Sequence, residues 1–115
     1  MSTRATEKKL GKIEWVSFGI GGYQDAMLGL SVTLSGGSWV VGDFKGFWSQ
    51  TIKCTTHSKW TEADRSAAYA DTARFVDDLL RKAKKTDVAK LVGVPVEVEF
   101  DGMSLRSWRV LEEVL

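Results

Sequence analysis

Residues 28–44 decide the fold, and they read Leu28-Gly29-Leu30-Ser31-Val32-Thr33-Leu34-Ser35, Gly36-Gly37-Ser38 and Trp39-Val40-Val41-Gly42-Asp43-Phe44. In the first part, leucine and valine alternate with glycine, serine and threonine, which is the two-residue period of a half-buried strand. The glycine-rich segment after it is typical of a hairpin turn. We therefore predict two antiparallel strands, the first with a small, polar second face that water or something bulky can lie against.

Upstream of this hairpin, the sequence predicts one more strand, over residues 12–18. Its apolar residues Ile13, Trp15 and Phe18 do not share one alternating face, so we expect a β-bulge or burial on both sides. Residues 19–25 are expected to form a loop, because its glycines can take positive φ angles. Residues 1–10 are polar and lack periodicity, which indicates a flexible tail.

Downstream, residues 47–55 are interpreted as a fourth strand or an irregular edge. The pair Thr61 and Asp64 is typical of a capping box, which predicts a long helix from about residue 62 to 84. Apolar side chains recur along it at helical spacing, at Ala68, Thr72, Phe75, Val76, Leu79, Leu80 and Ala83. A short second helix is predicted from residue 86 or 87 to 92, with Gly93 as its stop.

The C-terminal part predicts a second hairpin. Valine and phenylalanine alternate with polar residues over 94–100, Asp101-Gly102 signals a tight turn, and residues 104–111 return. The expected fold class is α+β, with an antiparallel sheet of about five to six strands and one long and one short helix packed on one face. The expected order is β-β-β-(β)-α-α-β-β, in a single domain over residues 11–115.

Composition narrows the class of protein. The chain has 115 residues, 43% hydrophobic and 27% charged, and 16 basic residues against 15 acidic ones leave a formal net charge of +1. Such a balance lacks the basic excess of a strong nucleic-acid binder. Near-zero charge also does little to oppose self-association, so a homodimer is a possible state. A lone cysteine, no secretory signal and no apolar run of membrane length favour a cytoplasmic location.

No catalytic, metal or cofactor site is predicted. Cys54 and His57 are the only thiol and imidazole, and neither has a second cysteine or histidine to complete a zinc set. Gly19-Ile20-Gly21-Gly22 lacks the spacing of phosphate-binding loops. Nothing in the spacing of the carboxylates Asp25, Asp43, Glu62 and Asp64 requires them to meet.

Five tryptophans are unusual in so short a chain. Trp15 and Trp108 are interpreted as core residues, whereas Trp39, Trp48 and Trp60 lie near turns or element ends. The alternative is that all five are buried or half-buried. Exposed rings beside polar groups and flexible backbone suit a recognition surface. The candidate binding residues are Tyr23, Gln24, Asp25, Asp43, Lys45, Trp48 and Trp60.

Several segments resemble small uncharacterised proteins of tailed bacteriophages and prophages. These segments are residues 18–30, 42–48, 60–65 and 107–111. The resemblance covers most of the chain from about Lys12, and it implies a bacterial cytoplasm and an accessory role during infection or lysogeny. It transfers no catalytic residue and no cofactor.

The leading hypothesis is therefore an accessory binding protein that occupies a host or defence protein and is not an enzyme. The alternative is a nucleic-acid or nucleotide-binding domain, which stacks bases on Tyr23, Trp39 and Trp48 beside nearby lysines. An enzyme and a structural component of the virion are the two other hypotheses.

Overall fold

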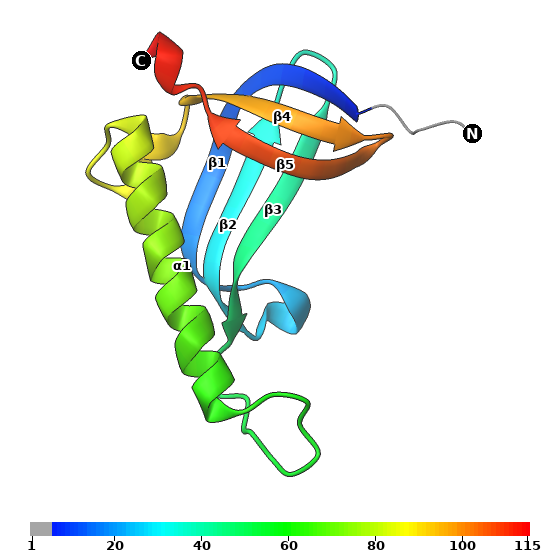
Figure 1. The fold of residues 1–115 in the computed structure, drawn as a ribbon, viewed down its shortest axis with the longest axis vertical. Coiled ribbons are helices and arrows are strands. Elements are labelled where there is room, and N and C mark those ends of the chain that lie inside the picture. The colour runs from blue at the N-terminus through cyan, green and yellow to red at the C-terminus, as the bar shows by residue number, and fades with distance from the viewer. Residues whose placement is uncertain (1–5) are drawn as a thin grey trace.

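The computed structural model describes residues 6–115, which form a strongly curled antiparallel sheet and one long helix (Figure 1). The strands are β1 (Thr6–Gly21), β2 (Met27–Ser35), β3 (Val40–Trp48), β4 (Pro95–Asp101) and β5 (Ser104–Val110). They are arranged in the order β3-β2-β1-β4-β5. The helix α1 (Glu62–Ala83) follows β3 in the chain and precedes β4. The α+β class and the antiparallel sheet are thus confirmed.

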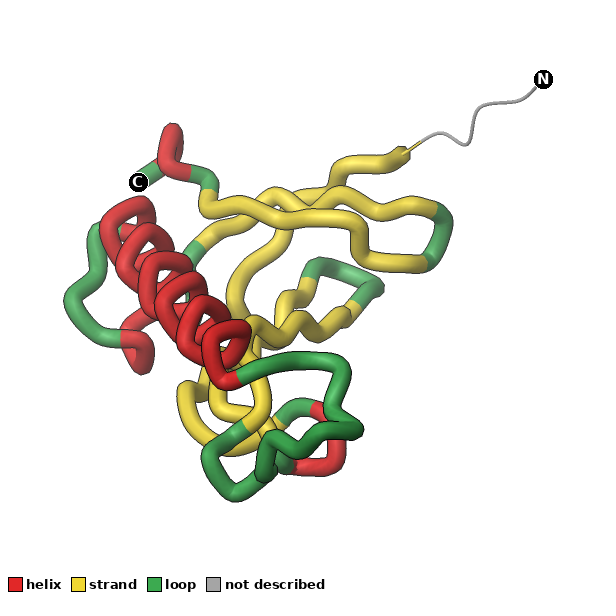
Figure 2. The backbone as a smooth tube through the Cα atoms, turned by 60° about the horizontal axis from the view of Figure 1, so that its bottom comes forward, coloured by secondary structure: helices red, strands yellow, loops and turns green. Residues whose placement is uncertain are grey.

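The long strand β1 produces the curl of the sheet, because its two halves pair with different neighbours. Its first half, from Thr6 to Lys12, pairs with β4, and its second half, from Lys12 to Gly21, pairs with β2. Between Ile13 and Trp15 the register shifts, so that Glu14 is a bulge, and the Ser35 hydroxyl donates a hydrogen bond to its carboxylate. A bulge increases strand twist. The expected irregularity in this strand is therefore confirmed, and Figure 2 shows the resulting bend.

The core lies on the concave side of the sheet. Leu30, Val32 and Leu34 of β2 are buried there, as the alternation of the sequence predicted. Leu79 of α1 and the buried valines of β4 belong to the same cluster. The indole of Trp39 packs edge-on against Phe100, with their ring centroids 5.3 Å apart, so this tryptophan belongs to the interior side of the hairpin.

The helix α1 begins with the predicted capping box. The Thr61 hydroxyl accepts a hydrogen bond from the Asp64 amide, and the Asp64 carboxylate accepts one from the Thr61 amide. At the other end, Lys84 takes a left-handed conformation with φ of 58° and closes the helix. Acidic residues in the first turn and basic residues in the last turn complement the helix dipole.

Four details differ from the sequence-based expectation. Residues 19–21, expected in a loop, continue β1 and pair with β2. The fourth strand is absent from the described residues, because β3 continues to Trp48 and residues 49–60 form a loop. The short second helix is a 3₁₀ turn, η2 (Val88–Leu91), capped by Asp87. Residues 6–10, expected in the flexible tail, belong to β1, because pairing with β4 orders a segment that has no apolar pattern of its own. Residues 1–5 of that expected tail lie outside the described part.

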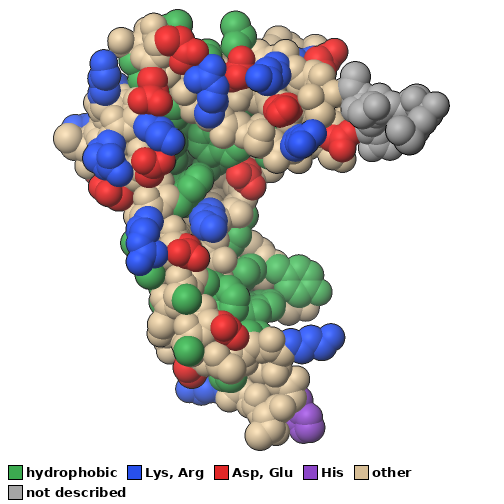
Figure 3. Space-filling model, viewed as in Figure 1, with side chains coloured by type: hydrophobic (Ala, Val, Ile, Leu, Met, Phe, Trp, Pro, Cys, Tyr) green, Lys and Arg blue, Asp and Glu red, His purple; other side chains and the backbone are tan. Residues whose placement is uncertain are grey.

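The molecule is hollowed between the β4–β5 hairpin and the far end of β3 (Figure 3). Hydrophobic side chains are visible in this hollow, while basic and acidic side chains mingle over α1 and the β4–β5 hairpin. Among residues 6–115, no helix combines the length and the apolar character that crossing a membrane requires.

Candidate functional site

The convex side of β1, β2 and β3 carries no charged side chain over four cross-strand rows. These rows follow from the register of the three strands, in which every second residue lies on the same side. We call this surface the uncharged face. It consists of Trp15, Ser17, Gly19 and Gly21 of β1, Met27, Gly29, Ser31 and Thr33 of β2, and Gly42, Phe44, Gly46 and Trp48 of β3.

Two paired glycines set the shape of this face. Gly29 and Gly46 lie opposite each other on β2 and β3. A methyl group on Gly46 would lie 2.2 Å from the carbonyl oxygen of Leu28, and one on Gly29 would lie 2.7 Å from Cζ of Phe44. The strands and the Phe44 ring therefore approach each other only because both positions lack a side chain. An aromatic ring over strand glycines restores packing that the glycines cannot supply.

Aromatic rings lie among these small residues on the uncharged face. Trp15 exposes 52% of its surface, so the expectation that it is a core residue is wrong. Its side chain follows the bulge at Glu14, which turns it to the convex side. Tyr23, from the turn after β1, is 66% exposed and meets Trp48 edge-to-face, with ring centroids 6.1 Å apart. Two of the predicted binding residues, Tyr23 and Trp48, are thus neighbours at one edge of the uncharged face.

The turn that presents Tyr23 is conformationally unusual. It is the 3₁₀ segment η1 (Tyr23–Asp25), in which Gln24 and Asp25 have positive φ, at 57° and 51°. Gly22, just before it, also has a positive φ, of 68°. Such angles are uncommon for residues other than glycine. The amides of Asp25 and Ala26 donate 3.2 Å hydrogen bonds to the carbonyl oxygens of Gly22 and Tyr23, and these bonds hold the turn. The side chains of Gln24 and Asp25 are exposed beside Tyr23.

Hydrogen bonds hold the end of β3 against α1. The Tyr69 hydroxyl donates a 2.7 Å hydrogen bond to the carbonyl oxygen of Trp48, and the Arg65 guanidinium donates to that of Ser49. Arg65 is only 2% exposed and also makes two hydrogen bonds to the carboxylate of Glu62, at 2.7 and 2.8 Å. These bonds lower the pKa of Glu62 below its usual value. The helix therefore fixes the strand that carries Trp48.

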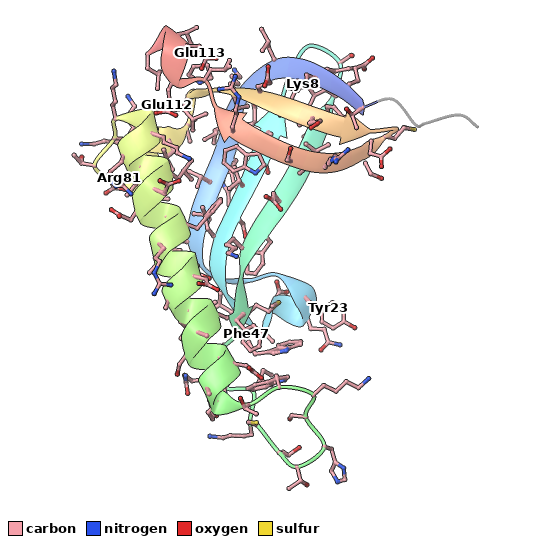
Figure 4. The ribbon with its side chains drawn as sticks, viewed as in Figure 1. Lys8, Tyr23, Phe47, Arg81, Glu112 and Glu113 are labelled. Atoms are coloured by element: carbon pink, nitrogen blue, oxygen red, sulfur yellow. The ribbon has the colours of Figure 1, made fainter. Side chains whose placement is uncertain are left out.

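Trp60 belongs to this contact between α1 and the end of β3, and it is not part of the uncharged face. Its ring meets Phe47 at a centroid distance of 5.4 Å and an interplanar angle of 90°, and the Arg65 guanidinium lies 4.6 Å from the ring centroid. Figure 4 shows Phe47 and Tyr23 at the same end of the sheet, Tyr23 beside the β1–β2 connection. This end of the molecule is therefore an aromatic cluster that the helix supports.

Asp43 and Lys45 lie on the opposite, concave side. The alternation of β3 separates them from Trp48, and they share a side with Phe47. The Asp43 carboxylate accepts a 2.8 Å hydrogen bond from the indole Nε1 of Trp108 and a 3.0 Å bond from the Phe44 amide. Lys45 lines an open hollow beside Asp71 and Arg74 of α1. The predicted set of binding residues is therefore divided between two sides of the sheet.

Cys54 and His57 lie in the loop between β3 and α1. The Cys54 thiol donates a 3.1 Å hydrogen bond to the carbonyl oxygen of Trp60, whereas His57 lies exposed in the same loop. Among residues 6–115, no group of three or more histidine, cysteine and acidic side chains is arranged to hold a metal ion.

Sequence reasoning missed four residues of this region: Trp15, Phe44, Arg65 and Tyr69. The spacing of Glu62 and Arg65 predicts contact on a helix, so the ion pair was open to prediction. The other contacts depend on the bulge and on the helix reaching the end of β3, which no local pattern encodes. Comparison of the chain with protein-family models, curated proteins and solved structures found no match.

Proposed function

We propose that this chain is a binding module that occupies a protein partner through the uncharged face. The observation that carries the proposal is the composition of that face, in which Trp15, Phe44 and Trp48 stand among glycine, serine and threonine. Large rings in a setting depleted of charge are typical of the centres of protein interfaces. Small residues around them let a partner approach the backbone closely.

The partner proposed from the resemblance to bacteriophage proteins is a host or defence protein in the bacterial cytoplasm. Tyr23, Gln24 and Asp25 then act as polar contacts at the rim of the interface, which is the usual place for such groups. The other three predicted residues do not contact this partner directly. Asp43 and Lys45 lie on the concave side of the sheet, and Trp60 packs against Phe47 next to α1.

The test is a retention experiment with bacterial lysate and two surface variants. We expect the immobilised wild-type chain to retain a partner in a fixed ratio, and Trp15→Lys to lose it, because the change replaces an exposed ring of the face with a charge. Met103→Lys is the matched control, since Met103 is 97% exposed in the β4–β5 turn. Equal retention by the wild type and Trp15→Lys, or no retained protein at all, would contradict the proposal.

A second candidate function, binding of a single-stranded nucleic acid, has one observation in its favour. The strand order, with a helix between β3 and β4, is that of the five-stranded OB-fold barrels, whose β2–β3 face and adjoining loops bind oligonucleotides and oligosaccharides. The lack of cations on the uncharged face argues against it, because phosphate contacts dominate such binding. A topology shared with a fold class is an analogy and assigns no ligand.

Tryptophan fluorescence separates the two candidates. If the partner is a protein, titration with oligothymidylate leaves the emission unchanged at low salt. Quenching that weakens steeply as salt rises, and that Trp15→Lys abolishes, would replace the protein partner with a nucleic acid.

A further inference from the structure

A second surface, separate from the uncharged face, runs along the free edge of β1. Residues 6–12 of this strand pair with β4, and Ile13 exchanges backbone hydrogen bonds with Gly93 and Val94. Beyond that point, residues 16–21 pair only with β2, and no other described strand lies on their second side. In an antiparallel pair, alternate residues direct their amide and carbonyl groups away from the partner strand. This stretch of β1 therefore offers unpaired backbone groups.

The sequence of this edge lacks the residues that usually protect edge strands. Residues 16–21 contain no charged residue and no proline, which are the common means of blocking further strand pairing. The bulge at Glu14 lies before the stretch and leaves residues 16–21 in regular register with β2. The side chains of Phe18 and Ile20 are 49% and 62% exposed on the concave side. An exposed, apolar and regular edge is a template for one more strand.

An apolar groove accompanies this edge. Phe18 of β1 forms one wall, α1 forms the other, and η2 lies at one end. The lining residues are Phe18, Ala73, Val76, Asp77, Leu80 and Val88, of which only Asp77 is charged. A strand added to β1 directs every second side chain toward the concave side, where this groove lies. The unpaired backbone and the apolar groove thus favour the same occupant, an extended segment with apolar residues at alternate positions.

We propose that the groove between β1 and α1 binds an extended peptide segment of another protein by strand addition to residues 16–21. A second copy of this chain fits less well. Its β1 would bring its own β2 on the far side, and β2 would then meet α1, which forms the outer wall of the groove. A single strand needs no such space. The one charged lining residue, Asp77, is paired at 3.4 Å with Arg81, so the groove favours apolar side chains and no particular charge.

The probe is a synthetic peptide of about nine residues in which valine and threonine alternate between terminal lysines, long enough for one strand. Added to the ¹⁵N-labelled chain, it is expected to slow amide exchange about tenfold at alternate residues of the stretch 16–21, because only amides that point to the edge gain a partner. The same peptide with proline at its central valine is expected to bind at least about tenfold more weakly, because it cannot complete the pairing.

Two charge substitutions locate the site. Phe18→Lys and Ile20→Lys are each expected to weaken peptide binding about tenfold, a change of about 1.4 kcal/mol. Both side chains are half exposed or more, and circular dichroism checks that each variant folds. Trp15→Lys, on the same strand but the opposite side, leaves peptide binding unchanged while it abolishes retention of the partner on the uncharged face. The two surfaces are therefore tested independently.

Three outcomes would overturn the inference. The first is no exchange protection at millimolar peptide, and the second is protection that does not alternate along the stretch. The third is a wild-type dimer in sedimentation analysis that Phe18→Lys converts to a monomer, since a second copy would then occupy the edge.

Discussion

At the scale of single residues, Arg65 shows how one buried cation organises a site. Its guanidinium satisfies the carbonyl oxygen of Ser49, pairs with Glu62 and lies against the Trp60 ring. A guanidinium suits this position because its planar set of donors serves several acceptors at once. The sequence shows only an arginine in the first turn of a helix, where the dipole makes a cation unfavourable. The structure explains this position, because the end of β3 presents the Ser49 carbonyl oxygen to the guanidinium.

The first prediction concerns this residue. Arg65→Ala is expected to lower the free energy of unfolding by about 2–4 kcal/mol, because it leaves a buried carbonyl oxygen without a donor and removes ring packing. Arg74→Ala is the matched control, since Arg74 also pairs with an acid three residues earlier but is 74% exposed. Its effect is expected to stay below about 0.5 kcal/mol. Urea unfolding measures both, and equal losses would contradict the role assigned to Arg65.

The glycines of the uncharged face give the second prediction. Gly46→Ala is expected to destabilise the fold by about 1–3 kcal/mol, because the new methyl group would overlap the backbone of β2. Gly19→Ala is the control on the same face, where a methyl group would meet no atom within 4 Å. That change is expected to be neutral or to stabilise by about 0.4–1 kcal/mol. Thermal unfolding of the two variants shows whether the stability loss arises from the close approach of the backbone at Gly46 or from replacing any glycine in these strands.

At the scale of elements, Arg109 of β5 holds the C-terminal 3₁₀ turn against the sheet. Its guanidinium donates two hydrogen bonds to Glu113 in η3 (Glu112–Val114), at 2.9 and 3.0 Å, and one to Glu97 in β4 at 3.1 Å. Glu112 and Glu113 lie beside the end of β5 in Figure 4. Hydrogen bonds from Arg109 lower the pKa of Glu113 from 4.5 to about 2.

The third prediction follows from the sign of this shift. Because the pKa of Glu113 is lower in the folded state, its contribution to stability is complete above about pH 4.5 and disappears as the pH falls toward 2. Glu113→Gln is therefore expected to be less stable than the wild type at pH 6 and equally stable near pH 2. Glu112→Gln, next to it, is the control and should not reproduce this pattern. Urea unfolding across the pH range provides the measurement, and a constant difference would exclude the linkage.

At the scale of the whole molecule, the sheet curls without closing. The end strands β3 and β5 do not pair, but the Trp108 indole of β5 donates a hydrogen bond to Asp43 of β3. Trp108 also packs edge-on against Phe75 of α1, with centroids 6.3 Å apart. Trp108 thus connects the two end strands, β3 and β5, to each other and to α1.

The fourth prediction tests that connection. Trp108→Phe keeps a ring against α1 but removes the donor to Asp43, and it is expected to lower the free energy of unfolding by about 1 kcal/mol. Amide exchange in β3 and β5 should accelerate together, because the two end strands lose their link. Trp15→Phe is the control on the convex side, with an expected change within about 0.5 kcal/mol. Faster exchange in only one of the two strands would contradict a shared restraint.

The sequence by itself determined the elements. Alternation over residues 28–34, the Thr61 and Asp64 cap and the Asp101-Gly102 turn are local signals, so β2, α1 and the last hairpin were predicted correctly. Tertiary structure alone decided which side each ring occupies. A one-residue bulge turned Trp15 outward, pairing with β4 ordered residues 6–10, and the register of β3 against β2 put Asp43 and Lys45 on the concave side. Such outcomes depend on register between segments distant in the chain, and a shift of one residue reverses every side chain that follows it.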